Sequence, residues 1–134
     1  DYLCLAVSPQ HRFAGRPGVS LEEVKKEKLI LRPTGAGTRI QFDSYLLNHS
    51  DSIRNFDVMM ELDNLATIKE LVSLNLGVTI VSRSACREDE KAGRLVVVPF
   101  EDARMTREVN LVYHRDFSHP DVPDDLRRIY NSLV

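Results

Sequence analysis

Short apolar runs alternate with helix-forming segments along this 134-residue chain, and that alternation restricts the fold more than any other feature. The apolar runs have the length of buried strands and lie at residues 2–7, 29–31, 57–62, 78–81, 95–100 and 109–113. Helical periodicity or capping residues predict helices at 21–27, about 40–48, 65–75, 84–91 and 123–133. Strands that alternate with helices predict an α/β fold with right-handed crossovers and a largely parallel sheet.

Several residues mark where these elements begin and end. Ser20 and Glu23 have the spacing of a capping box, which predicts the start of the first helix. Asp63 and Asn64 are both suited to cap the helix that follows the third strand. Gly77 is expected to close that helix, because glycine adopts a positive φ angle at no steric cost.

The composition limits the class of protein. An apolar content of 43% is enough to bury the core of one domain, which excludes a disordered chain. The 18 Lys and Arg residues nearly cancel the 20 Asp and Glu residues, and the net charge of -2 has the wrong sign for a surface that neutralises DNA phosphates. No apolar run approaches the roughly 20 residues of a membrane helix, and no signal segment opens the sequence. We therefore expect a cytoplasmic protein with no membrane contact.

Residues that could support catalysis or bind a metal are scattered. Cys4 and Cys86 have no neighbour at metal-ligand spacing, so we expect both to fill the core, and we predict no metal site and no cofactor. The four histidines lie in predicted loops or at element ends, namely His11, His49, His114 and His119. No nucleophile and base lie at a spacing that one local element could hold. The sequence therefore predicts a binding protein rather than an enzyme.

A glycine-rich segment at residues 34–39 follows the second strand and precedes a helix. Ligands of open α/β sheets bind at the carboxyl ends of strands, where the N–H groups and dipole of a helix start favour an anion. Thr34 and Thr38 add hydroxyl groups, and Arg39 adds a positive charge. A second helix start lies at 63–67, where the carboxylate of Asp63 would repel an anion unless it points away. The alternative interpretation is a capped turn, with Thr38 as the N-cap. A nucleotide site is not expected, because the segment lacks the complete Walker A and GxGxxG patterns.

These segments resemble the effector-binding domain of LysR-type transcriptional regulators over nearly the whole chain. Residues 3–14, LCLAVSPQHRFA, resemble the crossover strand and the His-Pro-Leu-Ala segment of that family, with Arg12 and Phe13 in place of the usual pair. Residues 20–24 are similar to its "sl.eL" helix and 29–39 to its strand and "GsGTR" turn. Residues 61–81 are similar to its strand, capped helix and "GLG-I" stretch, and 93–99 to its return strand.

The resemblance implies a two-lobed fold like that of the type 2 periplasmic binding proteins, with a small molecule held between the lobes. It implies that residues 1–12 and 92–134 form part of lobe one, and that residues 13–91 form a complete lobe two. The winged helix-turn-helix of the family is absent from this chain, so DNA contact is expected only through that region. The family further implies a bacterial regulator that forms a homodimer or homotetramer. Its effector would shift the lobes and change how the subunits pack.

The candidate ligand-binding residues follow from matching the family's motifs to this chain, and they are Thr34, Gly35, Gly37, Thr38, Arg39, Asn64 and Leu65. Helix-terminus physics favours a small anionic or carboxylate effector at these positions. Two residues depart from the family pattern. Asn75 stands where glycine or alanine is usual, and Ser82 where a proline often ends the strand, so we expect the back wall of the pocket to differ.

Two alternatives stay open on the sequence alone. One is a solute-binding protein of a transport system, which would carry a signal peptide, and the other is an α/β enzyme with a cleft built from the segment at 34–39. A helix-turn-helix upstream would distinguish the regulator from both. The partial lobe one would leave strand edges and an apolar face uncovered, so we also predict self-association through residues 95–113 or 126–133.

Overall fold

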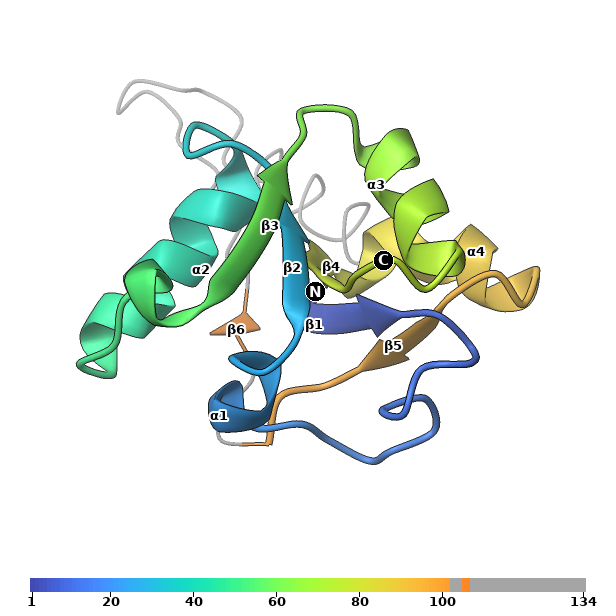
Figure 1. The fold of residues 1–134 in the computed structure, drawn as a ribbon, viewed down its shortest axis with the longest axis horizontal. Coiled ribbons are helices and arrows are strands. Elements are labelled where there is room, and N and C mark those ends of the chain that lie inside the picture. The colour runs from blue at the N-terminus through green and yellow to red at the C-terminus, as the bar shows by residue number, and fades with distance from the viewer. Residues whose placement is uncertain (102–104, 107–134) are drawn as a thin grey trace, which may run out of the picture.

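The structure is a computed structural model that describes residues 1–101, 105 and 106 (Figure 1). Its central strand is β1 (Tyr2–Val7), which pairs antiparallel with β4 (Thr79–Ser82) on one side. On its other side lie β5 (Val96–Val98) and β6 (Met105–Thr106), also antiparallel to β1. A parallel pair, β2 (Lys28–Leu31) and β3 (Asp57–Glu61), is joined to this sheet by a parallel bridge between Leu29 and Val78.

The helices overlap the predicted segments over the described residues, but the first ends at Val24 rather than near Glu27, and the predicted helix at 84–91 begins as a 3-10 helix. They are α1 (Leu21–Val24), α2 (Gly37–Asn48), the 3-10 helix η1 (Ile53–Asn55), α3 (Leu65–Ser73), the 3-10 helix η2 (Arg83–Cys86) and α4 (Arg87–Lys91). The predicted capping box is confirmed, since the Ser20 hydroxyl accepts from the Glu23 N–H and the Glu23 carboxylate accepts from the Ser20 N–H. Asn64 rather than Asp63 is the N-cap of α3. The predicted strand at 109–113 and helix at 123–133 lie outside the described residues.

The prediction of a largely parallel sheet is wrong for the central strand. All described strands that pair with β1 run against it, whereas β2, β3 and β4 run in one direction. The helices that return the chain for parallel pairing are α2 and α3, with 12 and 9 residues. The connection from β1 to β2 contains only the 4-residue α1. The direction of β2 follows from its neighbours: β4 is antiparallel to β1, and β2 is parallel to the start of β4, so β2 runs opposite to β1.

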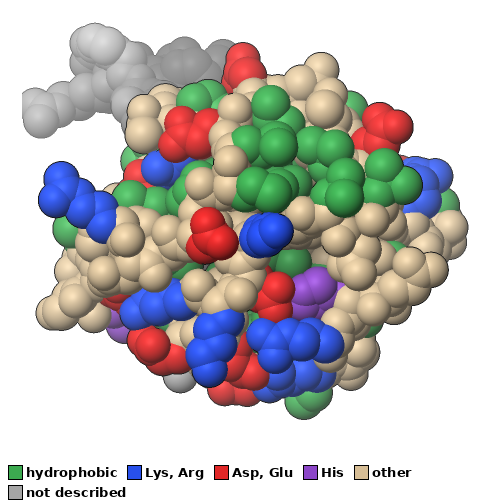
Figure 2. All heavy atoms as spheres, viewed as in Figure 1, with side chains coloured by type: hydrophobic (Ala, Val, Ile, Leu, Met, Phe, Trp, Pro, Cys, Tyr) green, Lys and Arg blue, Asp and Glu red, His purple; other side chains and the backbone are tan. Residues whose placement is uncertain are grey.

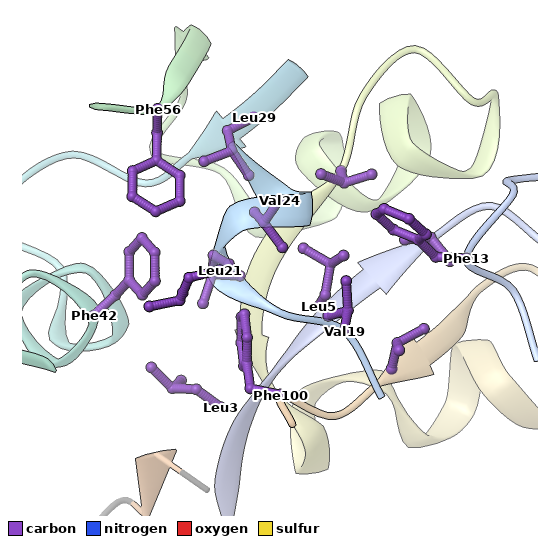
Figure 3. Packing of buried hydrophobic residues seen from close by; sticks show 14 of the residues in the cluster. Leu3, Leu5, Phe13, Val19, Leu21, Val24, Leu29, Phe42, Phe56 and Phe100 are labelled. Atoms are coloured by element: carbon purple, nitrogen blue, oxygen red, sulfur yellow. The ribbon is translucent and has the colours of Figure 1, made fainter. Parts of the chain in front are cut away.

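The core covers both faces of β1, as the apolar run predicted. Leu3, Leu5 and Val7 belong to one buried cluster, whereas Cys4 and Ala6 face a second one. The first cluster extends to the inner side of α2, where the rings of Phe42 and Phe56 meet edge to face with centroids 5.7 Å apart (Figure 3). The second cluster holds α3 against the sheet through Ile68 and Val72.

The turn after α3 differs from the prediction in one respect. Asn75, and not Gly77, takes the positive φ angle, at 61°. Asn tolerates this conformation better than other non-glycine residues. Gly77 is needed for space instead, because a Cβ atom there would lie 2.9 Å from Ile30 Cδ1 and 3.0 Å from the carbonyl oxygen of Lys28. The glycine therefore allows the start of β4 to approach β2.

One sheet contains strands from both of the lobes that the sequence suggested. β1 and β5 come from residues 1–12 and 92–134, and β4 comes from residues 13–91. The two groups are hydrogen-bonded neighbours along the whole of β4. The lobe boundaries stay a prediction.

Candidate functional site

The strands β2 and β3 end side by side, and each is followed by the start of a helix (Figure 1). We call this place the strand-end edge, formed by residues 31–39 and 61–65. The Leu62 N–H donates to the Leu31 carbonyl oxygen at 2.9 Å, which holds the two strand ends together. The N-terminal ends of α2 and α3 therefore open on the same edge of the sheet, as expected for parallel strands joined by helices.

The first turn of α2 presents backbone N–H groups that have no internal acceptor. The Ala36 N–H donates to the Pro33 carbonyl at 2.9 Å, and the first helical bond runs from the Ile40 N–H to the Ala36 carbonyl at 2.9 Å. Between them, the N–H groups of Gly37 and Thr38 find no acceptor among the described residues, and neither does that of Gly35. Unpaired N–H groups at a helix start are the usual donors to a bound anion.

Side chains leave this turn open. Thr34, Gly35 and Gly37 are exposed, and Thr38 is half-buried. The alternative interpretation with Thr38 as N-cap is wrong, because α2 begins at Gly37 and its N-cap, Ala36, has no side-chain acceptor. A Cβ atom at Gly35 would meet nothing within 4 Å. Among the residues that the structure describes, no side chain caps this turn.

Arg39 does not extend its charge toward this opening. Its side chain is 5% exposed and donates from Nη1 to the Arg32 carbonyl at 3.0 Å and to Glu61 Oε1 at 2.9 Å. Its Nε donates to Asp43 Oδ1 at 3.2 Å. The positive charge predicted to assist an anion is therefore shared with two carboxylates, and the attraction for a ligand rests on backbone N–H groups and hydroxyls.

The second helix start is held by similar contacts. Asn64 Oδ1 accepts from the Thr67 N–H at 3.2 Å and caps α3. Asp63 does not stand alone, because its Oδ1 lies 3.3 Å from Nη2 of Arg32. This pairing reduces the repulsion that an unpaired carboxylate would exert on an anion. Leu65, the first residue of α3, is half-buried and exposes part of its apolar surface.

The surface beside the strand-end edge is apolar. Figure 2 shows hydrophobic side chains gathered over the region where Figure 1 shows α3. Leu62, Leu65 and Leu71 are only partly buried against the core. Apolar surface around a few oriented donors is the usual composition of a small-molecule site. The two residues that depart from the family pattern do not belong to the strand-end edge. Asn75 follows the C-terminal end of α3, and Ser82 is buried at the end of β4.

A cavity away from the strand-end edge was not predicted from the sequence. It has a volume of about 500 Å³ and is lined by Asp1, Tyr2, Arg83, Arg87, Glu90 and Lys91. Arg83 donates to the Tyr2 hydroxyl at 2.8 Å. The spacing of four residues between Arg83, Arg87 and Lys91 could have indicated a basic helix face.

The described cysteines are buried in the core, and His11 contacts other protein groups. Cys4 and Cys86 are both buried and free, as predicted, and burial raises the pKa of the Cys86 thiol to about 11. His11 accepts from the Phe13 N–H at 3.0 Å through Nδ1, and its Nε2 lies 3.2 Å from Glu27. Among residues 1–101, 105 and 106, no group of three His, Cys or acidic residues could hold a metal ion. The same residues contain no helix that is long and apolar enough to span a membrane.

Two helix starts at one edge of an α/β sheet are the arrangement at which open α/β sheets bind ligands. The profile of the LysR substrate binding domain family matches residues 1–130, and the chain belongs to this family. Its fold is accordingly the periplasmic-binding-protein-like fold of LysR regulatory domains, as the sequence predicted.

The relatives are helix-turn-helix transcriptional regulators. The chain is 34% identical over 120 residues to the regulator MJ0300 of Methanocaldococcus jannaschii, covering 90% of this chain and 40% of that protein. It is 34% identical over 115 residues to the regulator YeiE of Escherichia coli K12, covering 86% of this chain and 38% of that protein. The chain thus spans about two fifths of the length of these relatives.

Solved structures show the same fold. An OxyR mutant from Corynebacterium glutamicum aligns with a TM-score of 0.77 at 22% identity, over 99% of this chain and 42% of that one. The effector-binding domain of QuiR in complex with shikimate aligns with a TM-score of 0.63 at 16% identity, over 76% of this chain and 46% of that one. The Synechocystis CcmR regulatory domain in complex with 2-PG aligns with a TM-score of 0.62 at 21% identity, over 72% of this chain and 45% of that one.

Proposed function

We propose that this chain is the part of a LysR-type transcriptional regulator that senses a small anionic or carboxylate metabolite. The effector would bind at the strand-end edge, against Thr34, Gly35, Gly37 and Thr38, with Asn64 and Leu65 on its other side. The observation that carries the proposal is the open first turn of α2. Its N–H groups lack acceptors among the described residues, and the helix dipole adds to their attraction for negative charge.

Arg39 enters this proposal in a different role from the one that the family motif suggested. Its guanidinium is buried between Asp43 and Glu61, so it supports the turn rather than meeting the ligand. With Arg32, Arg39, Asp43, Glu61 and Asp63 all close to the edge, carboxylates outnumber cations there. This balance favours an effector with one negative charge and further polar groups over a polyphosphate.

The family relationship supports the regulatory role. The relatives are transcriptional regulators, and the QuiR and CcmR domains hold small molecules in their structures. In this proposal, the effector shifts the lobes of the domain and changes the packing of a homodimer or homotetramer in the cytoplasm. DNA would be bound by a winged helix-turn-helix in another part of the protein. The solute-binding and enzyme alternatives are not favoured, since the relatives are regulators.

Calorimetric titration of the purified protein with small carboxylates, including shikimate, and with 2-PG tests the site. For any compound that binds, Thr38→Ala removes a hydroxyl, and Gly35→Val adds a side chain to the turn at a position where a Cβ atom meets nothing within 4 Å. A lost hydrogen bond to a charged ligand costs about 1.5–3 kcal/mol, so we expect affinity to fall at least tenfold.

Ser44→Ala is the matched control, because Ser44 is exposed on the same helix and lies away from its first turn. This variant should bind like the parent. Unchanged affinity in both Thr38→Ala and Gly35→Val would show that the effector binds elsewhere. Sedimentation velocity of the protein with and without the bound compound tests the oligomer change, and identical sedimentation coefficients would contradict it.

A further inference from the structure

Arg39 is a buried cation at the point where the two halves of the candidate site meet. It stands in the first turn of α2, and its side chain is 5% exposed. Its three hydrogen bonds run to the carbonyl of Arg32, to Glu61 and to Asp43. These partners belong to three different segments, namely the exit of β2, the end of β3 and the second turn of α2.

The contacts of Arg39 form part of a larger connection between the two helix starts. Arg32, whose carbonyl accepts from Arg39, also pairs through its own guanidinium with Asp63 at 3.3 Å. The backbone bond from the Leu62 N–H to the Leu31 carbonyl lies between these two side-chain links. Three interactions therefore link the β2–α2 segment to the β3–α3 segment: the Arg39–Glu61 pair, the Arg32–Asp63 pair and the backbone bond between Leu62 and Leu31.

The chemistry of the guanidinium group suits this role. One planar group with five N–H donors reaches a carbonyl and two carboxylates in fixed directions, and an ammonium group cannot reproduce that geometry. Because the two carboxylates neutralise the charge and the side chain is covered, an effector at the turn has little access to it. The contacts that keep Arg39 away from the ligand are made with the segments that carry the ligand-facing groups. Arg39 can therefore fix the position of those groups.

We propose that Arg39 is a positioning residue that couples the two halves of the site. It acts through the Arg32 carbonyl and Glu61, so that the N–H groups of Gly35, Gly37 and Thr38 keep one position relative to the start of α3 at residues 64–65. The coupling is a property of the fold, and its relevance to sensing rests on the proposed function. Removing the hydrogen bonds of Arg39 should therefore also weaken the structure at the start of α3, about 25 residues further along the chain.

Amide hydrogen exchange, followed by NMR on the purified protein, measures this coupling without any effector. The reporters on the α2 side are the N–H groups of Ala36 and Ile40, and those on the α3 side are Leu62 and Ile68, all of which donate to backbone carbonyls. The reference is the Val78 N–H, which donates to the Lys28 carbonyl at 2.9 Å inside the sheet. In Arg39→Met we expect exchange at Leu62 and Ile68 to accelerate at least tenfold, and exchange at Val78 to stay within threefold of the parent.

Conservative variants separate positioning from general stability. Arg39→Lys keeps the charge but reaches fewer partners, so it should restore part of the protection at Leu62. Glu61→Gln weakens one link alone and should accelerate exchange at Leu62 more than at Ile40. Arg12→Met is the control, because Arg12 is an exposed arginine paired with Glu27 at 2.7 Å, and it should change none of these rates.

Two outcomes would overturn the inference. Acceleration confined to Ala36 and Ile40 would mean that Arg39 supports only its own helix, and equal acceleration at Val78 would mean that it is an ordinary core residue. If Arg39→Met does not fold, Arg39→Lys and Glu61→Gln decide the same question. Failure of the proposed effector site appears instead as unchanged affinity in Thr38→Ala, so the two failures can be told apart.

Discussion

Gly77→Ala is expected to destabilise the protein substantially, although the substitution adds a single methyl group. The added Cβ would lie 2.9 Å from Ile30 Cδ1 and 3.0 Å from the carbonyl oxygen of Lys28. The Ile30 side chain is completely buried, and the Lys28 carbonyl accepts the Val78 N–H, so neither can move without disturbing the junction of β2 and β4. Overpacking of this kind costs about 1–3 kcal/mol.

Two backbone bonds cross the same junction. Val78 N–H donates to the Lys28 carbonyl at 2.9 Å, and Ile30 N–H donates to the Val78 carbonyl at 2.8 Å. Each contributes about 0.5–1.5 kcal/mol, and lengthening them adds to the packing cost. The loss of unfolded-state entropy offsets about 0.4–1 kcal/mol. We therefore expect a net loss of about 3 kcal/mol, which corresponds to a midpoint about 10 °C lower in thermal unfolding.

Circular dichroism during thermal unfolding and urea titration measures this difference directly. Gly35→Ala is the matched control, because a Cβ atom there meets nothing within 4 Å and its φ angle is not positive. That variant should be as stable as the parent or up to about 1 kcal/mol more stable. If Gly77→Ala unfolds at the same temperature as Gly35→Ala, the close approach of β4 to β2 is incorrect.

Two further predictions concern polar side chains. Thr79→Val should raise the free energy of unfolding by about 1 kcal/mol. The reason is that the Thr79 hydroxyl is completely buried with no hydrogen-bond partner among the described residues. An unchanged or lower urea midpoint would contradict this prediction. The hydrogen bond from Lys25 lowers the pKa of Asp51 from 3.8 to about 2. A carboxyl with a lowered pKa stabilises the fold above pH 3.8 and loses that effect as the pH falls toward 2. In urea titrations at pH 6, Asp51→Asn should therefore have a free energy of unfolding about 1 kcal/mol below that of the parent. At pH 2 the two proteins should be nearly equally stable. The same difference at both pH values would contradict the ion pair.

Local signals predicted the elements better than the sheet order. The capping box at Ser20 and Glu23 and the apolar run of β1 depend on neighbouring residues, and both were confirmed. The direction of β1 depends instead on whether the chain returns across the sheet before β2. The connection between these strands, residues 8–27, contains one short helix, α1, which ends at Val24 and not near Glu27. No local signal in this connection indicates the direction in which β2 runs, because that direction depends on pairing with distant strands.

The candidate site shows the same division between local and distant information. The glycine turn and the start of α3 follow from sequence, because glycines and an N-cap residue mark them locally. The pairing of Arg39 with Glu61 spans 22 residues, and no spacing rule could predict it. Only the parallel alignment of β2 with β3 brings these side chains together. The ligand-binding residues therefore stay a prediction, and the structure adds that Arg39 bonds to protein groups that the sequence did not indicate.

A crystal structure of the protein with an effector that binds in solution tests the central claim most directly. We predict an oxygen of the effector at about 3 Å from the backbone nitrogen of Gly37 or Thr38, with Arg39 still bonded to Glu61. An effector seated instead in the cavity beside Arg87 and Lys91, with the first turn of α2 unoccupied, would contradict the assignment of the site.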